Sequence, residues 1–240
     1  MSGTVLSVRG LSKSFSGVMA VKNADFSLER GRITAFLGPN GAGKTTTIKM
    51  VLGFLREDSG RIELRARTLG YVPEQPVFFS WIKGWELLDR TSKQHGIPHE
   101  RRWERIATLC ERLSLDCRLL DRRIVNCSQG NKKKFSYLQS LLVSPDLFIV
   151  DEPFTALDPT SIMNARRLLR ELAEGGAAVF LSTHLISEVE KIYDDVIIIM
   201  DGEVVIRKKR EDLSPGTNLE TLFLSSVRSP SRKKVAATKG

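Results

Sequence analysis

A glycine-rich stretch, FLGPNGAGKTTTIKM from Phe36 to Met50, carries residue types suited to binding phosphate. Its centre, GPNGAGKT, fits the G-x-x-x-x-G-K-[ST] phosphate-loop pattern without a mismatch. Glycines allow the backbone conformations in which successive N–H groups converge on one anion, and a following helix directs its positive dipole end to the same place. We therefore expect Lys44 to reach the β- and γ-phosphates of a nucleotide and Thr45 to hold Mg²⁺.

The residues on either side of this loop predict the strand and the helix that the pattern requires. RITAFL, Arg32 to Leu37, predicts a buried strand before the loop, and Thr46 to Leu52 predicts a helix after it. A glycine-rich turn with a chance lysine would not explain this context. The residues of the loop that we expect to contact the nucleotide are Gly38, Pro39, Asn40, Gly41, Ala42, Gly43, Lys44, Thr45 and Thr46.

A second motif, LFIVDE from Leu147 to Glu152, is an apolar strand that ends in two acids. A buried strand delivers its last side chains to the carboxyl edge of the sheet, where ligands bind in such folds. There Asp151 is placed to support Mg²⁺, and Glu152 is placed to polarise an attacking water as general base. By itself the pattern is more often an ordinary strand end, but the phosphate loop upstream favours the catalytic interpretation.

Composition and charge bound the class of protein. The chain has 240 residues, 41% of them hydrophobic, which is enough for a sizeable core and one or two domains. No apolar run approaches the roughly 20 residues of a membrane helix, and the N-terminus has no secretory h-region. The three cysteines lack metal spacing and indicate reduced thiols in cytosol. The net charge is +9, of which five charges belong to the last thirteen residues, so we expect a basic tail.

The remaining patterns predict an α/β protein. VLSVRGLSKSF and AVKNADFSLERG alternate as strands of an antiparallel patch, and SGRIELRARTLGYVPE is strand-like up to Pro73. Helical spacing runs from Trp81 to Leu142, and strand–helix units follow it. We expect a P-loop NTPase core with a mostly parallel sheet, an N-terminal antiparallel β patch and an inserted helical subdomain at about 81–142. The domain should span 1–224, and 225–240 should be a basic, unfolded tail.

The motifs together resemble a known family. GPNGAGKTTT, LFIVDEP, FTALD at 154–158 and STH at 182–184 stand in the order and spacing of ATP-binding-cassette (ABC) nucleotide-binding domains, from Val5 to about Phe223. The resemblance implies that Phe15 stacks on adenine, that Asp158 lies in a loop communicating across a dimer, and that His184 senses the γ-phosphate. For Phe15 a plain core aromatic is the alternative.

Two motifs depart from the family pattern. The signature, usually LSGGQ, reads CSQGN at 127–131, where Ser128 and Gly130 keep the hydroxyl and the bare backbone N–H that contact phosphate. Such strings resemble those of sodium, drug and polysaccharide exporters, so we interpret the signature as competent; a subunit that binds ATP without hydrolysing it is the alternative. In GYVPEQP, Glu74 stands where the family often has a glutamine near Mg²⁺, and Gln75 follows; either could serve, and Gln75 joins the expected site.

The resemblance implies an ATPase subunit of an ABC transporter, using ATP and Mg²⁺. Two subunits, identical or paralogous, would close head-to-tail over two ATP molecules on the cytoplasmic side of the membrane, peripheral to a separately encoded permease that works in export. The surface of residues 74–83 and the helices after Trp81 would contact that permease. A soluble cassette ATPase acting on DNA or ribosomes is the rival: the net charge favours it, but the chain lacks a long coiled coil and a second cassette. We expect no nucleic-acid partner.

Overall fold

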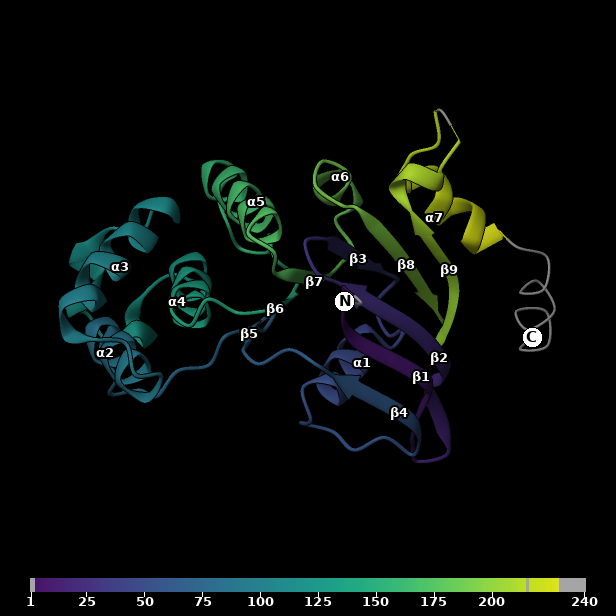
Figure 1. The fold of residues 1–240 in the computed structure, drawn as a ribbon, viewed down its shortest axis with the longest axis horizontal. Coiled ribbons are helices and arrows are strands. Elements are labelled where there is room, and N and C mark those ends of the chain that lie inside the picture. The colour runs from purple at the N-terminus through teal and green to yellow at the C-terminus, as the bar shows by residue number, and fades with distance from the viewer. Residues whose placement is uncertain (1–2, 215, 229–240) are drawn as a thin grey trace.

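A computed structural model describes residues 3–214 and 216–228 and consists of two sheets flanked by helices (Figure 1). The central sheet has six strands in the order β5-β6-β7-β3-β8-β9, all parallel except β9, which pairs antiparallel with β8. Every residue of β3, β6 and β7 is buried, as expected for a parallel sheet covered on both faces. The strands are β3 (Ile33–Leu37), β5 (Leu69–Val72), β6 (Leu147–Asp151), β7 (Ala178–Thr183), β8 (Asp195–Met200) and β9 (Glu203–Lys209).

A smaller antiparallel sheet, in the order β2-β1-β4, covers one face of the central sheet. It consists of β1 (Thr4–Phe15), β2 (Val18–Glu29) and β4 (Ser59–Leu64). Three rings join the two sheets: Phe26 of β2 lies 5.9 Å from Phe36 of β3 and 5.7 Å from Phe180 of β7 between ring centroids. The strand-like stretch before Pro73 divides between the sheets, because β4 joins the antiparallel patch and β5 joins the central sheet.

The side chains of the central strands alternate between two hydrophobic clusters. Ala35, Leu37 and Leu181 face the cluster under α4 and α5, whereas Phe36 and Phe180 face the cluster under the antiparallel patch and α1. This period-two alternation places helices on one face and the patch on the other. The helices packed on the core are α1 (Lys44–Val51), α5 (Pro159–Glu174), α6 (Ile186–Val189) and α7 (Leu219–Arg228).

A helical subdomain lies at one end of the molecule, on the far side of β5 and β6 from β9 (Figure 1). It contains α2 (Gly84–Gln94), α3 (His99–Arg112), α4 (Gln129–Leu141) and 3₁₀ turns at Cys117–Asp121 and Ile124–Asn126. Its helices therefore occupy the range in which the sequence predicts helical spacing. The polypeptide enters the subdomain after β5 and leaves it before β6, so the insertion connects two adjacent strands.

The C-terminal segment differs in part from the prediction. Residues 225–228, expected to belong to an unfolded tail, form the last turn of α7, so the helix continues past the predicted boundary at 224. The rest of the predicted tail, 229–240, lies outside the described residues. Within the part of the chain that the structure describes, no helix is both long enough and apolar enough to cross a bilayer.

Candidate functional site

The phosphate loop connects β3 to α1, as its motif predicts, and two of its glycines sit where a side chain would collide with backbone. A Cβ at Gly38 would lie 2.4 Å from the carbonyl oxygen of Ile199, and one at Gly43 would lie 2.5 Å from that of Ala20. Gly43 also has a φ of 104°, which L-residues rarely adopt. The loop is therefore wedged between β8 and the start of β2, which fixes its backbone N–H groups in place.

Lys44 begins α1 and folds back over the loop. Its Nζ donates to the carbonyl oxygens of Gly38, at 2.7 Å, and Pro39, at 3.1 Å, and the residue is 7% exposed. Burial lowers the pKa of this ammonium, while the carboxylates of Glu152, Asp151 and Glu74 act in the opposite direction. The loop therefore carries a buried positive charge beside its own backbone, which is the sign of charge that a polyphosphate requires.

The expected Mg²⁺ ligands, Thr45 and Asp151, face each other at the sheet edge. Thr45 Oγ1 donates to Asp151 Oδ2 at 3.1 Å, and Ser182 Oγ of the neighbouring strand β7 donates to the other carboxylate oxygen. Asp151 is buried and has its side chain fixed from two sides. A hydroxyl and a carboxylate are hard oxygen donors of the kind Mg²⁺ prefers, so the residues present fit this ion.

Glu152 follows Asp151 in a strained turn. Its φ is 51°, a left-handed conformation that costs a non-glycine residue of order 1–3 kcal/mol and persists only where the surroundings enforce it. Its Oε2 accepts from Thr183 Oγ1 at 2.9 Å, and its Oε1 lies 2.8 Å from Nδ1 of His184. Glu152 is buried while the side chain of His184 is 53% exposed, so the pair extends from the sheet edge towards solvent.

Phe15 is an exposed ring at the end of the β1–β2 hairpin. Phe15 pairs with Val18 across the hairpin. Gly43 of the phosphate loop packs against Ala20, two residues after Val18, so the end of the hairpin lies next to the phosphate loop. The residue is 48% exposed, which excludes the alternative that Phe15 is a core aromatic. Lys13 lies over the ring, 5.8 Å from its centroid.

A second group of predicted residues caps helices α4 and α5. Ser128 is the N-cap of α4 and accepts from the N–H of Asn131 at 3.3 Å, while Asp158 is the N-cap of α5. Gly130 packs against the loop between β6 and α5, because a Cβ there would lie 2.6 Å from the carbonyl oxygen of Ala156. Within residues 3–214 and 216–228, no hydrogen bond or ion pair joins this group to the phosphate loop, so the chain presents two separate sets of residues predicted to contact the nucleotide.

The segment after β5 carries Glu74 and Gln75, and both side chains are exposed. Burial lowers the pKa values of Lys44 and Lys133, and the Glu74 carboxylate, together with Asp151 and Glu152, acts in the opposite direction. The side chain of Gln75 makes no hydrogen bond to any residue in the described ranges. Contact of Gln75 or Glu74 with the nucleotide stays a prediction.

Lys133 and Tyr137 of α4 are site residues that the sequence reasoning missed. Lys133 is 1% exposed, and its Nζ donates to the carbonyl oxygens of Pro73 and Asp151, both at 2.8 Å, and Glu74, at 3.3 Å. Burial lowers its pKa to about 8. Tyr137, one turn further along, donates to the carbonyl oxygen of Pro153 at 3.1 Å. The only sequence signal was four-residue spacing, and the lysine run KKK predicts an exposed face instead.

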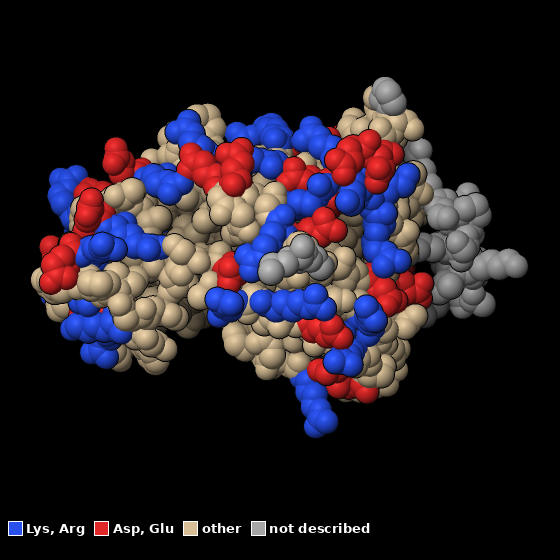
Figure 2. Space-filling view, in the orientation of Figure 1, with Lys and Arg blue, Asp and Glu red and all other residues tan. Residues whose placement is uncertain are grey.

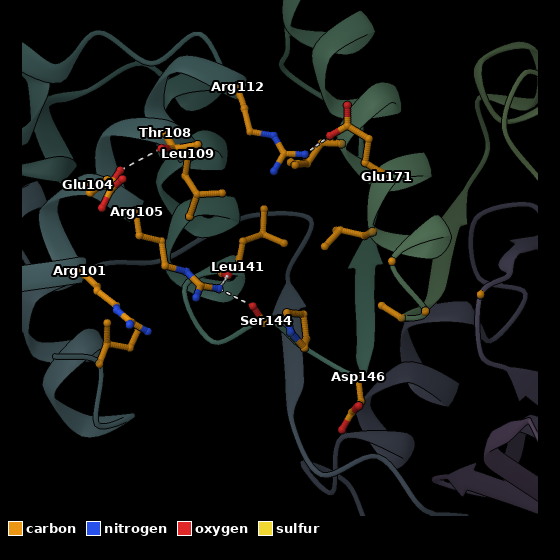
Figure 3. Close-up of a pocket in the computed structure, with 18 of the residues that line it drawn as sticks. Arg101, Glu104, Arg105, Thr108, Leu109, Arg112, Leu141, Ser144, Asp146 and Glu171 are labelled. Atoms are coloured by element: carbon orange, nitrogen blue, oxygen red, sulfur yellow. Dashed lines mark hydrogen bonds and ion pairs between the residues drawn. The ribbon is translucent and has the colours of Figure 1, made fainter.

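A cleft of about 1130 Å³ lies away from these residues. It lies between α3 and α5 at the edge where the strands begin, opposite the phosphate loop, and arginines of α3 project across it (Figure 3). Arg112 pairs with Glu171 of α5, and Arg105 donates to the last carbonyl of α4, at Leu141, and to Ser144. Arg105 and Arg112 are thus held by a helix C-terminus and by an ion pair. We interpret the cleft as the boundary between the helical subdomain and the core.

The fold and the site define a P-loop ATPase, and comparison with known proteins identifies its family. Residues 21–155 match the ABC transporter family. The chain is 36% identical over 226 residues to the uncharacterized ABC transporter ATP-binding protein YxlF of Bacillus subtilis (strain 168), covering 91% of this chain and 76% of the relative. It is 33% identical over 221 residues to the ABC-type transporter ATP-binding protein EcsA of the same organism, covering 88% and 89%. The chain belongs to the ABC transporter family, as an ATP-binding protein and an ATPase.

Solved structures agree with this assignment. The ATP-binding subunit of an ABC transporter superimposes with a TM-score of 0.87 at 28% identity, covering 93% of this chain and all of that one. A dimeric ATP-binding cassette in a post-hydrolysis state, bound to ADP and Pi, has a TM-score of 0.77 at 20% identity, covering 85% of this chain and 98% of that one. The second likeness shows the same fold.

Proposed function

We propose that Glu152 is the general base of ATP hydrolysis in this subunit. The observation that carries the proposal is the position of its buried carboxylate, which Thr183 and His184 hold next to Asp151 and the phosphate loop. The loop N–H groups and Lys44 bind the phosphates, and Glu152 orients and deprotonates the attacking water. His184, half exposed and bonded to Glu152, is placed to contact the γ-phosphate.

Mg²⁺ accompanies ATP in this proposal. Thr45 and Asp151 would hold the ion, which supplies positive charge that neutralises the β- and γ-phosphate oxygens. Ser182 keeps the Asp151 carboxylate oriented whether or not Thr45 donates to it. Glu74 is the further acidic group whose charge reaches this region.

The test is Glu152→Gln, which keeps the shape of the side chain and its acceptor for Thr183 but removes the base. ATP binding should persist while kcat falls about 10²-fold or more, the range for loss of a general base. Glu104→Gln, an exposed glutamate at the cleft opposite the site, is the control and should keep wild-type kcat. Near wild-type hydrolysis by Glu152→Gln would remove Glu152 from this role.

The active form that we propose is a head-to-tail dimer of this chain or of this chain and a paralogue. Support comes from the two separate sets of phosphate-binding groups: the phosphate loop on one edge, and Ser128 with Gly130 at the first turn of α4. The N-terminus of an α-helix with a capping serine and a bare glycine favours an anion. Facing copies would complete each other's site, and Ser128 and Gly130, both present, make the subunit competent to hydrolyse.

The partner that we propose is a separate membrane permease, which would hold this subunit at the cytoplasmic face, and the transport direction that we propose is export. A groove of about 270 Å³ lies between the segment after β5 and helices α2 and α4, lined by Tyr71, Phe78 and Gln94 among others. Next to it, Phe79 and Trp81 stack at 5.5 Å between centroids although they are 70% and 50% exposed. Exposed large apolar groups beside a groove are typical of protein interfaces. The proposed direction, export, is based only on the signature sequence at 128–131, which resembles that of exporters.

Trp81→Ser tests this surface. The variant should keep basal ATPase activity, because the ring lies outside the nucleotide site, and should lose co-purification with the permease from native membranes. Met163→Ser, on α5 of the core, is a control of similar exposure, 51%. Retention of the permease by Trp81→Ser would place the docking surface elsewhere.

The face of the molecule shown in Figure 2 gives no support to the rival proposal, action on DNA or ribosomes. On the face shown in Figure 2, Lys and Arg side chains alternate with Asp and Glu rather than forming one basic field. Several of the arginines are paired with carboxylates, for example Arg32 with Asp195 and Arg170 with Asp194. Nucleic-acid binding depends on unpaired positive charge aligned with phosphates, so we propose no nucleic-acid partner.

A further inference from the structure

Helix α4 directs three side-chain donors from one face, two towards the backbone of the catalytic edge and the third towards strand β5. Lys133, Tyr137 and Ser140 follow one another at spacings of four and three residues, which places them on a common helix face. Lys133 Nζ binds the carbonyls of Pro73, Glu74 and Asp151, Tyr137 Oη binds that of Pro153, and Ser140 Oγ binds that of Tyr71 at 2.6 Å.

Two of these bonds bracket Glu152. The carbonyl before it, of Asp151, accepts from Lys133, and the carbonyl after it, of Pro153, accepts from Tyr137. The N–H of Glu152 itself donates to the carbonyl of Ser182 on β7 at 2.9 Å. Each of these three backbone groups is held by another element, and the strained φ of 51° at Glu152 requires such enforcement.

We propose that Lys133 and Tyr137 are positioning residues for hydrolysis, which hold the Glu152 turn from α4 and so set the direction of its carboxylate. The inference rests on the proposed role of Glu152 as general base. Both side chains are buried, and neither forms a hydrogen bond or an ion pair with the carboxylate; their hydrogen bonds reach the backbone on either side of Glu152. A displacement of about 1 Å in a catalytic group can cost about 10²-fold in rate.

The same contacts connect the turn to two other parts of the site. Ser128 and Gly130 lie at the start of α4, so a movement of that end is carried by a rigid helix to Lys133 and Tyr137. Lys133 also binds Pro73 and Glu74, the segment that leads into the groove proposed for the permease. In the proposed dimer, α4 thereby links one nucleotide to the catalytic glutamate of the other and to the docking surface.

The experiment compares full-length variants for kcat, for ATP affinity and for melting temperature. Tyr137→Phe removes one hydroxyl and should lower kcat about fivefold, the value of one buried hydrogen bond, with ATP affinity unchanged. Lys133→Met, similar in length but without donors, should lower kcat tenfold or more. Lys133→Arg restores the donors and should exceed Lys133→Met in kcat. Ser140→Ala is the matched control: it removes a hydroxyl-to-carbonyl bond from the same helix face, away from the turn, and should keep kcat within about twofold.

The outcomes separate this inference from the proposed function. Tyr137→Phe with the kcat of Ser140→Ala, or equal kcat for Lys133→Arg and Lys133→Met, would overturn the positioning role. A fall in ATP affinity that matches the fall in kcat would also overturn it, because positioning the base affects the chemical step alone. If Lys133→Met does not fold, Tyr137→Phe decides. Glu152→Gln is measured in parallel, since its retention of activity would instead refute the assignment of the base.

Discussion

Alanine substitutions at Gly41 and Gly43 of the phosphate loop should lower the free energy of unfolding by different amounts, because an added Cβ has free space at one position and not at the other. Gly41 has a φ of 80° but nothing within 4 Å of an added Cβ, whereas Gly43 combines a φ of 104° with a contact at 2.5 Å to the carbonyl oxygen of Ala20. Gly41→Ala therefore carries only the left-handed penalty, about 1–2 kcal/mol. Gly43→Ala carries a similar penalty and, in addition, about 1–3 kcal/mol for overpacking against backbone.

The assay is thermal unfolding without nucleotide, followed by circular dichroism. For a domain of this size 1 kcal/mol shifts Tm by about 2–4 °C, so Gly41→Ala should lower Tm by about 2–8 °C. Gly43→Ala should lower it by about twice as much, because Ala20 belongs to β2 and cannot move without disturbing the antiparallel patch. Equal Tm values for the two variants, or a larger loss for Gly41→Ala, would refute the argument that the loop is wedged against β2.

Three further predictions concern single contacts. Phe15→Ala should weaken ATP binding about tenfold, the value of one stacked base, without lowering Tm, whereas Phe54→Ala, an exposed ring beside Tyr71, should leave affinity unchanged in a fluorescent-nucleotide titration. Hydrogen bonds from Lys13 and Ser14 lower the pKa of Asp58 to about 2, so the ionised Asp58 side chain stabilises the fold fully above about pH 4 and loses this effect as the pH falls towards 2. The Tm difference between wild type and Asp58→Asn should therefore vanish between about pH 4 and pH 2, and a Tm difference that stays constant would contradict this role of Asp58. In tagged heterodimers of Lys44→Ala with Ser128→Arg, one intact site should reappear and trap one nucleotide, whereas each homodimer should be inactive; no trapping would contradict the facing arrangement.

The phosphate loop, the β6 acids and the sheet were predictable because their information is local. Ile33 to Thr45 and Leu147 to Glu152 each contain the strand, the turn and the chemical groups within one short segment. The structure joins these segments through Thr45 and Asp151, as expected of neighbouring carboxyl ends in a parallel sheet. The division of residues 59–72 between two sheets could not be predicted, because alternation shows that a strand has a buried face but not which sheet it joins.

Lys133 shows why other parts of the site were missed. In sequence it is the middle residue of KKK and predicts a solvated helix face. In the structure its acceptors at Pro73 and Asp151 are 60 and 18 residues away, and all are backbone carbonyls, which carry no side-chain signature. The same limit applies to Glu74 and Gln75, which are adjacent, polar and both exposed, so burial does not separate them either.

The two edges of the central sheet bear on how this protein avoids aggregation. β5 ends the sheet with only four residues, and β9 ends it with a strand whose last three residues are Arg207, Lys208 and Lys209. Short or positively charged edge strands are poor templates for pairing with another chain. In the proposed dimer, a subunit that closes against and separates from a second copy in every cycle would meet that copy at high local concentration. Because β5 is short and β9 is positively charged, neither edge strand favours pairing with a strand of the second copy. The two copies would then associate through the reversible dimer interface and not through a continuous intermolecular β-sheet.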